Sequence, residues 1–443
     1  MNNYTKKLTL QTVWLVGLSI IFIGWLAAHR SSLSSGELGL VLVSVGSLFG
    51  LVATYLFLTQ FLLISGAKFI ESRWGLDRLS GSHALNGKVG FGLLLVHPFL
   101  INLGRTMTSG EESLIQGYIE GYLDLVRSSW QMTLASIGLS LFFIIIFTSI
   151  VMVRKRLRYE LWHFIHLATY LAVLLPAFHQ LQRGQTLNGL AWFKYYWIGL
   201  FVFAFGTIIY FKFIRPLQLY LKHRFIVDEV VKEAEGVVSV YVTGKKLEEF
   251  TYEAGQFALW RFMNKQLGRE RHPFTISSSP QDKRLRITVK DIGDFSHKIQ
   301  TLEPGTPVVV DGPYGRFTSV VQTKKQRLFI AGGIGVTPLV SQLKSASSKN
   351  DTLIYGVRTS KDLALQKELS QTKANIIVVF SDEERKGAET GRVDEALLKK
   401  RVNDIKQHDV WLCGPPPMMD GVEKALLNLG VPTSQIHTER FRL

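Results

Sequence analysis

The sequence predicts a membrane-embedded bundle of six α-helices, followed by an antiparallel β-barrel and then by an α/β domain with a parallel sheet. Apolar runs dominate up to about Ile214, whereas the sequence from Pro216 onward is mixed and charged. Short alternating apolar segments come next, and after Lys324 the pattern changes to strands followed by helical stretches. With 443 residues the chain is long enough for two or three domains. The predicted domains are 1–216, 217–320 and 321–443.

Six stretches approach the roughly 20 residues that an α-helix needs to cross a bilayer. Turn or charged residues interrupt them, as at 30–32 and 65–66, so they form a bundle of helices instead of one long span. A signal peptide is the alternative for residues 1–28, but the apolar run is longer than a usual signal core, which favours a retained helix. The six stretches lie near 8–28, 37–64, 83–103, 131–153, 160–182 and 192–214.

The net charge of +16 is concentrated in alternate connections between these helices. The connection between the third and fourth helices is acidic instead. By the positive-inside rule, we expect a multi-pass protein of the cell membrane whose N-terminus and C-terminal half are cytoplasmic. This placement makes lipid the surroundings of the bundle and argues against a nucleic-acid partner. The acidic residues are Glu111, Glu112, Glu120 and Asp124, and the basic ones are Lys6, Lys7, Lys68, Arg73, Arg78, Arg154, Lys155, Arg156, Arg158, Lys212, Arg215, Lys222 and Arg224.

The third predicted helix carries two histidines, His83 and His97, fourteen positions apart. Ionisable groups at membrane depth are costly and usually face the interior of a bundle, and a neutral imidazole is a good iron ligand. The spacing returns to nearly the same face of a helix and separates the two rings by about 21 Å along its axis. The helix can therefore hold two stacked groups, one near each side of the membrane.

The fifth predicted helix carries His166 and His179, about 20 Å apart along its axis. The separation of these two histidines along the axis matches that of His83 and His97 on the third helix. On an ideal helix, however, their side chains would point in directions well over ~90° apart. Pro176 lies between them and could kink or re-phase the helix. His163 competes with His166 as the inner ligand, and helical phase does not choose between them.

Both helices run outward from the cytoplasm, so we expect His83 to face His166 and His97 to face His179. Two bis-histidine sites stacked across a bilayer have the geometry needed for two b-type haems. A single buried histidine is more often a core or interfacial residue. His29 lies at an outer helix end, and we interpret it as interfacial. Four histidines at matched depths favour metal ligands instead.

The sequence after the membrane helices has two patterns. The segments VVSVYVTG, QFALWRF, LRITVKD and TPVVVDGPYG are typical of an antiparallel barrel. The segments RLFIAGGIGVTPLVSQL, DTLIYGVR and NIIVVFSD are typical of a parallel sheet with crossover helices. We therefore place a domain boundary near residue 320.

Three short motifs could hold a ligand. HPFT, at 272–275, is expected to form a turn at a strand end, where an aromatic ring, hydroxyls and amides hold a flat heteroaromatic ring. AGGIGVTP follows a strand and precedes a helix, so its glycines let the backbone approach a pyrophosphate. In WLCGPPPMM, successive prolines are expected to form a stiff loop that carries Cys413 and Gly414 toward a ligand at the strand ends. Cys413 is the only cysteine, which excludes an intramolecular disulfide and an ordinary iron–sulfur cluster.

Two helices with paired histidines are followed by a fixed series of motifs. The series is HPFT, KDIGDFS, DGPYGRF, AGGIGVTP and CGPPPMM, and it ends with the near-terminal Phe441. This order resembles the NADPH oxidase and ferric reductase superfamily, and the bacterial NADPH oxidases in particular, over nearly the whole chain. The resemblance implies a ferredoxin-NADP reductase-like module, with an FAD-binding barrel and an NADPH-binding α/β domain. The implied cofactors are FAD, two haem b groups and NADPH, with NADH as the alternative donor.

The resemblance also implies roles for single residues. His83 with His166, and His97 with His179, would ligate the inner and outer haems, and the family pattern favours His166 over His163. The flavin ring would lie against His272, Pro273, Phe274 and Thr275, with Thr275 near the reactive edge. The flavin phosphates would contact Lys290, Gly293, Asp294 and Ser296. The dinucleotide phosphates would contact Gly333, Gly335, Thr337 and Pro338, and the nicotinamide would lie beside Cys413, Gly414 and Pro415.

Two further assignments have alternatives. Phe441 resembles the aromatic residue that covers the flavin and must yield to nicotinamide, although two residues follow it here and core packing is the other interpretation. Arg358 is a candidate for binding the 2′-phosphate of NADPH, and a solvated surface charge explains it equally well. Thr275, Cys413 and Phe441 are thus the expected catalytic residues.

These parts predict electron transfer from NADPH through FAD and two haems to an acceptor across the membrane. The acceptor would be dioxygen, giving superoxide, or a ferric or cupric chelate, and the overall resemblance favours dioxygen. A second hypothesis is a haem-free, membrane-anchored flavin reductase that serves a partner protein or quinone. A third is an ion pathway built on the histidines, which leaves the dinucleotide motifs unexplained. The sequence shows no obligatory protein partner.

Overall fold

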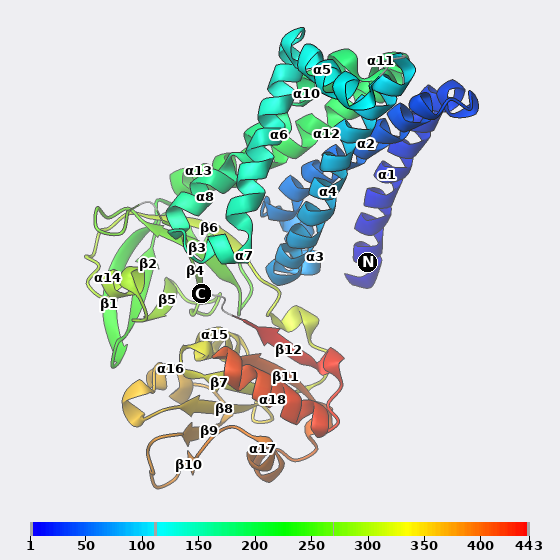
Figure 1. The fold of residues 1–443 in the computed structure, drawn as a ribbon. Coiled ribbons are helices and arrows are strands. Elements are labelled where there is room, and N and C mark those ends of the chain that lie inside the picture. Colours follow the sequence, from blue (N-terminus) through cyan, green and yellow to red (C-terminus); the bar gives the residue numbers. More distant parts are fainter. Residues whose placement is uncertain (1–2, 110–112, 269, 441–443) are drawn as a thin grey trace. The chain divides into compact units, whose positions relative to one another are not determined.

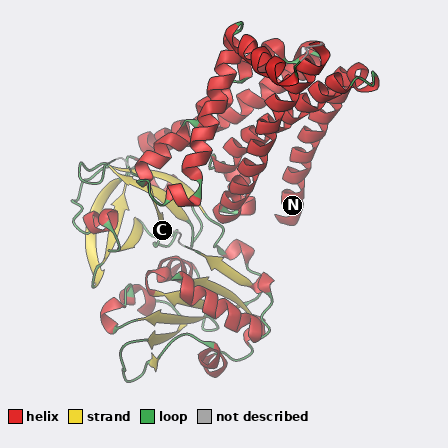
Figure 2. Ribbon diagram, viewed as in Figure 1, coloured by secondary structure: helices red, strands yellow, loops and turns green. Residues whose placement is uncertain are grey.

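The structure is a computed structural model that describes residues 3–109, 113–268 and 270–440. The chain divides into two compact units, Met1–Lys212 and Phe213–Leu443. Helices build the described part of the first unit, whereas the strands all belong to the second (Figure 2).

Six helical stretches are long and apolar enough to cross a membrane, which confirms the prediction of a multi-pass membrane protein. They agree with the predicted stretches in number and order among the described residues. They are formed by α1 (Asn3–Ser34), α2 (Leu38–Ile64), α4 (Leu76–Ser109), α6 (Trp130–Ser149), the series α8 (Tyr159–Leu167), α9 (Thr169–Leu174) and α10 (Ala177–Arg183), and α12 (Ala191–Ile209) with its continuation through a π-helical turn into α13 (Arg215–His223). Shorter helices are α3 (Lys68–Trp74), α5 (Leu114–Arg127), α7 (Val151–Arg154) and α11 (Gln185–Gly189).

The acidic connection between the third and fourth membrane helices contains the amphipathic helix α5. Its N-cap is Ser113, whose side chain accepts a hydrogen bond from the backbone of Gln116 at 3.4 Å. Asn102 of α4 donates to the carbonyl of Tyr118 at 2.5 Å, which ties α5 to the bundle. The acidic charge of this connection was the feature noted in the sequence, and it did not predict a helix.

The fifth membrane stretch is broken into three helices. Turns at Ala168 and at Leu175–Pro176 separate α8, α9 and α10, and proline explains the second break because it has no backbone N–H to donate. Gly138 of α6 lies against this break, where a Cβ atom would be 3.0 Å from the Pro176 ring. At Pro176, where the sequence allowed a kink or a re-phasing, the structure has a break between two helices.

Glycines bring α2 and α4 into close contact, and Figure 1 shows the two helices side by side. A Cβ atom on Gly39 would lie 2.7 Å from the carbonyl oxygen of Gly104. Further along α2, a Cβ atom on Gly46 would lie 3.1 Å from the backbone nitrogen of Ile101. Small residues at such a seam let helix backbones approach closely in a membrane, where packing must replace the hydrophobic effect.

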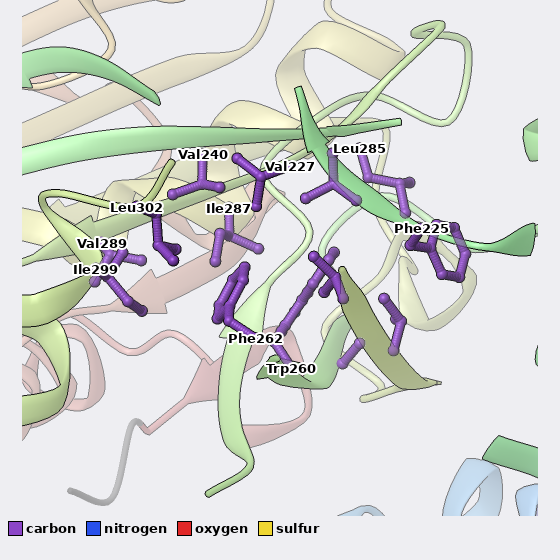
Figure 3. Close-up of a cluster of buried hydrophobic side chains, with 14 of the residues drawn as sticks. Phe225, Val227, Val240, Trp260, Phe262, Leu285, Ile287, Val289, Ile299 and Leu302 are labelled. Carbon is purple, nitrogen blue, oxygen red and sulfur yellow. The ribbon is translucent and has the colours of Figure 1, made fainter. Parts of the chain in front are cut away.

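The second unit begins with two three-stranded antiparallel sheets, ordered β1-β2-β5 and β4-β3-β6. Their inward-facing residues enclose one apolar core, which includes Val240, Trp260 and Ile287 (Figure 3). The predicted strands are confirmed as β2, β3, β5 and β6. The bounds are β1 (Ile226–Ala234), β2 (Val237–Thr243), β3 (Phe257–Phe262), β4 (His272–Thr275), β5 (Leu285–Lys290) and β6 (Val308–Tyr314), with α14 (Asp294–Ile299) between β5 and β6.

The prediction of a turn at HPFT was wrong, because these residues form strand β4. The strand lies at the edge of its sheet, where Leu259 of β3 is the partner of Pro273. An edge strand tolerates proline, since one side of its backbone has no neighbour to which an N–H must donate. The motif therefore presents its side chains from a paired strand.

A six-stranded parallel sheet follows, ordered β10-β9-β8-β7-β11-β12, which confirms the predicted α/β domain. Alternate residues of β7 pack with α15 on one face and with α18 on the other, so helices cover both faces. The strands are β7 (Gln326–Gly332), β8 (Thr352–Val357), β9 (Asn375–Phe380), β10 (Glu389–Thr390), β11 (His408–Cys413) and β12 (Ile436–Glu439). The helices are α15 (Val336–Ser345), α16 (Gln366–Ser370), α17 (Glu395–Arg401) and α18 (Pro416–Asn428).

The prolines of WLCGPPPMM do not form the stiff loop that the sequence predicted. Pro416 and Pro417 are the first two residues of α18, and Pro415 is its N-cap. Proline suits the first turn of a helix because the N–H groups there have no partner within the helix. Cys413 is therefore the last residue of β11, and only Gly414 and Pro415 separate it from α18.

Candidate functional site

Two pairs of histidines face each other inside the first unit. We call His83 of α4 with His166 of α8 the His83 pair, and His97 of α4 with His179 of α10 the His97 pair. The ring centroids are 6.1 Å apart in the His83 pair and 6.4 Å apart in the His97 pair. The structure thus brings together the pairs that the sequence predicted.

The His83 pair is held between helices and one aromatic ring. The two imidazole planes meet at 63°, and the indole of Trp162 stacks on His166 with ring centroids 5.1 Å apart. The Nδ1 atoms of His83 and His166 are buried and have no hydrogen-bond partner within the described part of the chain. The competing His163 has an exposed side chain, whereas His166 is half-buried.

The His97 pair is held by the backbone of α2. Nδ1 of His97 lies 2.7 Å from the carbonyl oxygen of Gly46. Because a carbonyl only accepts, Nδ1 carries the proton and the lone pair of Nε2 is left for a ligand. A Cβ atom on Gly50 would lie 2.7 Å from the same Nδ1, so the ring rests directly against the α2 backbone.

The rings of the His97 pair both line one cavity. Phe57 of α2 and Phe142 of α6 form part of its apolar wall, and their rings stack with centroids 4.4 Å apart. Thr54 and Gln180 are the polar side chains that line it besides the two histidines. A largely apolar cavity with two facing imidazoles suits a flat, apolar metal complex.

The spacing of both pairs fits one metal ion each. Two imidazoles that share an ion through bonds of about 2 Å have ring centroids roughly 6 Å apart. Among the described residues, no group of three or more histidine, cysteine, aspartate or glutamate side chains could hold a metal. Each histidine pair can therefore offer two imidazole ligands to one metal ion.

The HPFT strand contributes to a stack of rings in the barrel. The imidazole of His272 lies on the ring of Phe295 with centroids 3.6 Å apart, and Phe274 lies 6.2 Å from Phe295. Nε2 of His272 is 2.8 Å from a carboxylate oxygen of Glu270. Thr275 is buried, and Pro273 is exposed on the edge strand. Phe295 was missed by sequence reasoning, although it lies within KDIGDFS.

The loop before α14 is closed by the hydroxyl of Ser296. This oxygen accepts from the backbone N–H groups of Ile292 and Gly293, and it donates to the carbonyl of Gly293, each at 2.9 Å. Asp294 is exposed at the start of the helix. The fourth residue expected at the flavin phosphates, Lys290, lies 3.4 Å from Asp362 in the α/β domain.

The predicted dinucleotide residues gather at the carboxyl edge of the parallel sheet. Gly333 follows β7, Arg358 follows β8 and Gly414 follows β11, and β7 is the neighbour of both other strands. A Cβ atom on Gly414 would lie 3.0 Å from the Cα of Gly332, and one on Gly335 would overlap the Cys413 carbonyl. Open α/β sheets bind ligands at this edge, so the backbones of the two loops form a candidate dinucleotide site.

Three family models match consecutive parts of the chain. The ferric reductase like transmembrane component matches residues 49–177, the FAD-binding domain matches 230–318, and the oxidoreductase NAD-binding domain matches 329–424. The chain therefore has the domain architecture of the NADPH oxidase and ferric reductase superfamily. The matches thus join a ferric reductase like membrane component to a reductase module with an FAD-binding and an NAD-binding domain.

Curated relatives share part of their length with this chain. Flavohemoprotein A of Dictyostelium discoideum is 26% identical over 49% of this chain and 59% of its own length. The glycine betaine monooxygenase reductase subunit of Chromohalobacter salexigens is 30% identical over 38% of this chain and 50% of its own length. The chain thus spans between 50% and 59% of these two relatives.

Solved structures also resemble part of this chain. The FAD/NAD-binding domain of nitric oxide dioxygenase from Vibrio cholerae matches 50% of this chain and 99% of its own, with 24% identity and a TM-score of 0.43. A ferredoxin NADP+ reductase from Neisseria gonorrhoeae, solved with FAD and NADP, matches 49% of this chain and 98% of its own, with 16% identity and a TM-score of 0.44.

The remaining predicted site residues have distinct surroundings. Thr337 and Pro338 are buried in the first turn of α15, where the Thr337 hydroxyl donates to the carbonyl of Ile334 at 3.1 Å. Arg358 is exposed. Burial raises the pKa of the Cys413 thiol well above its ordinary value, and the Glu439 carboxylate raises that pKa further. Cys413 is therefore a neutral thiol at neutral pH, and Phe441 lies outside the described residues.

Polar contacts between the barrel and the α/β domain were also missed by sequence reasoning. Arg286 forms an ion pair with Glu368, and both side chains are buried. The hydroxyl of Ser341 donates to the carbonyl of Ser278 at 2.6 Å. These contacts join residues far apart in sequence, and no local pattern marks them.

Proposed function

We propose that the protein transfers electrons from cytosolic NADPH, through FAD and two b-type haems, to dioxygen on the other side of the membrane, with superoxide as product. The proposal rests on two pairs of facing imidazoles, whose ring centroids are 6.1 Å apart in one pair and 6.4 Å apart in the other. The same chain has an FAD- and NAD-binding module. We assign 1–216 to haem binding, 217–320 to FAD and 321–443 to NADPH. The N-terminus and the reductase module would be cytoplasmic.

When bound, FAD would accept a hydride and release single electrons, and each haem iron would carry one electron at a time. The protein's part is to bind and orient these groups. His83 with His166, and His97 with His179, would hold the two haem groups.

The reductase module would orient the donor against the flavin. The HPFT strand and Phe295 offer ring faces, and the loop closed by Ser296 offers backbone groups for flavin phosphates. The two glycine loops at the sheet edge would admit the dinucleotide phosphates, with Cys413 beside the nicotinamide as a neutral contact. Thr275 would lie near the reactive edge of the flavin, Phe441 would cover it, Lys290 and Asp294 would adjoin its phosphates, and Arg358 would contact the 2′-phosphate.

NADH is the alternative donor. A relative that is 29% identical over 47% of this chain is named a Na(+)-translocating NADH-quinone reductase subunit, from Haemophilus influenzae. Rates with NADPH and NADH over a range of concentrations compare the two donors directly. A higher kcat/KM with NADH would overturn our assignment of NADPH.

A ferric or cupric chelate reductase is the second candidate, because the membrane half matches a model described as ferric reductase like. The two functions separate in one assay with purified protein. NADPH-dependent dye reduction that superoxide dismutase abolishes supports the oxidase. Reduction of a ferric chelate without oxygen, and no superoxide in air, supports the chelate reductase.

A reduced-minus-oxidised absorption spectrum tests the haems themselves. We expect b-type bands in protein expressed with ample porphyrin supply. A protein that lacks these bands yet oxidises NADPH would be the haem-free flavin reductase, and the proposal of a haem pathway would fail.

A further inference from the structure

A chain of hydrogen bonds connects the residue after His179 to two other helices. The indole N–H of Trp197 in α12 donates to the amide oxygen of Gln180 at 2.9 Å. The amide nitrogen of Gln180 donates to the hydroxyl of Thr54 in α2 at 2.8 Å. Thr54 in turn donates to the carbonyl of Gly50, whose backbone lies against His97. One side chain of α10 is thus fixed to both α12 and α2.

These hydrogen bonds lie in buried, largely apolar surroundings, where an unpaired polar group costs the most free energy. Trp197 is fully buried, Thr54 is 8% exposed, and Gln180 and Thr54 both line the cavity of the His97 pair. An unpaired amide or indole N–H in such apolar surroundings costs free energy, so the partners hold one another in a single arrangement. The position of Gln180 is therefore more narrowly defined than helix packing alone would make it.

The backbone does not set the rotation of α10 by itself. The helix has seven residues and follows the break at Leu175–Pro176. In one unbroken helix, the thirteen-residue spacing would rotate His179 by about 140° from His166. Another contact has to fix the rotation that turns the imidazole toward His97, and Gln180 is the adjacent residue that bonds to fixed helices.

We propose that Gln180 is a positioning residue, which sets the rotation of α10 and thereby holds the His179 imidazole in line with His97. This inference rests on the proposed haem pathway. The imidazole planes of the His97 pair meet at 35°. A change of rotation would alter this angle and the strength of the axial bond, and both affect the electronic structure of a bis-imidazole iron.

Gln182 provides a matched control on the same helix. It is exposed, and it bonds to Gln131 of α6 instead of to groups at the cavity. Methionine has nearly the volume of glutamine but offers no comparable hydrogen bond. The pair Gln180→Met and Gln182→Met therefore removes the same chemical group from one helix at two sites, only one of which adjoins the His97 pair.

The experiment uses the full-length, haem-loaded protein and needs no turnover. Electron paramagnetic resonance of the oxidised protein resolves low-spin irons by the angle between their imidazole planes, and a redox titration gives two midpoint potentials. We expect Gln180→Met to change one signal and one potential and to leave the others unchanged. Loss of one haem to excess apomyoglobin should become on the order of 10-fold faster, as for other outer-sphere ligand partners. Gln182→Met should match the wild type.

Each outcome has a defined meaning. Unchanged signals and potentials in Gln180→Met, with two haems present, would overturn the positioning role. If that variant does not fold, Thr54→Val removes one partner of Gln180 with almost no change of volume, and unchanged signals in it would overturn the role equally. A wild type without haem would refute the proposed haem pathway itself.

Discussion

The two histidine pairs have nearly the same ring separation but are built by different means. The rings of the His83 pair cross at 63° and have no described hydrogen-bond partner at Nδ1, and an indole stacks on His166. The His97 pair has a backbone hydrogen bond from His97 to Gly46. Helix geometry and ring packing are the described supports of the first pair, whereas the second also uses polar contacts and close backbone approach.

The difference follows from the helices that supply the ligands. His83 and His97 belong to one continuous helix, which continues through Pro98. His166 and His179 belong to separate helices of a broken stretch. An unbroken helix fixes both depth and rotation, whereas a break releases rotation and requires further contacts to restore it.

Removal of a ligand should have the largest effect. We expect His97→Ala and His179→Ala each to lose one haem and to abolish electron transfer to the acceptor, because one axial bond cannot replace two. Flavin reduction by NADPH should continue, since the reductase module is intact. Haem content by pyridine haemochrome and stopped-flow flavin bleaching measure the two effects, and retention of both haems in either variant would contradict the pairing.

The choice between His166 and His163 comes next. We expect His166→Ala to lose the haem of the His83 pair, because the His166 ring faces His83 at 6.1 Å, and His163→Ala to retain it, because the His163 side chain is exposed. The haem-to-protein ratio of the purified variants is the measurement. A ratio of two for His166→Ala with a ratio of one for His163→Ala would reverse the assignment.

A methyl group on α2 should disturb only the His97 pair. In Gly50→Ala the new Cβ would lie 2.7 Å from Nδ1 of His97, so the ring must move and its bond to Gly46 must weaken. We expect about 10-fold weaker binding of one haem. Gly92→Ala on α4 is the control, because its Cβ would meet nothing within 4 Å. Equal haem retention and equal midpoint potentials in the two variants would show that α2 does not support the ring.

The smallest effect should come from Cys413, which lies in the unit that contains neither pair. Burial raises the pKa of the folded thiol, so the folded protein keeps a proton that the unfolded chain loses above about pH 8.5. Stability should therefore fall above that pH, by up to about 1.4 kcal/mol per pH unit. Cys413→Ala should flatten this part of the pH dependence of thermal unfolding and leave both haem spectra unchanged. An identical pH dependence in variant and wild type would count against a buried, neutral thiol.

Sequence patterns predicted most of the fold because the patterns are local. Six apolar stretches, four of the six barrel strands and the alternation of strands and helices all depend on neighbouring residues. HPFT and GPPP were assigned wrongly as a turn and a loop. In both, proline was taken to exclude regular structure, whereas an edge strand and a first helical turn accept it. Whether a strand lies at an edge depends on distant strands.

The sequence by itself determined the depths of the four histidines, because a constant rise per residue converts spacing into height. It also determined the order of the modules, since each motif is contiguous. Only the tertiary structure decided which rings meet and how they are held: the rotation of α10, the bond from His97 to Gly46 and the stack of Phe295 on His272. Rotation after a helix break depends on contacts with distant segments, and no spacing within one segment encodes it.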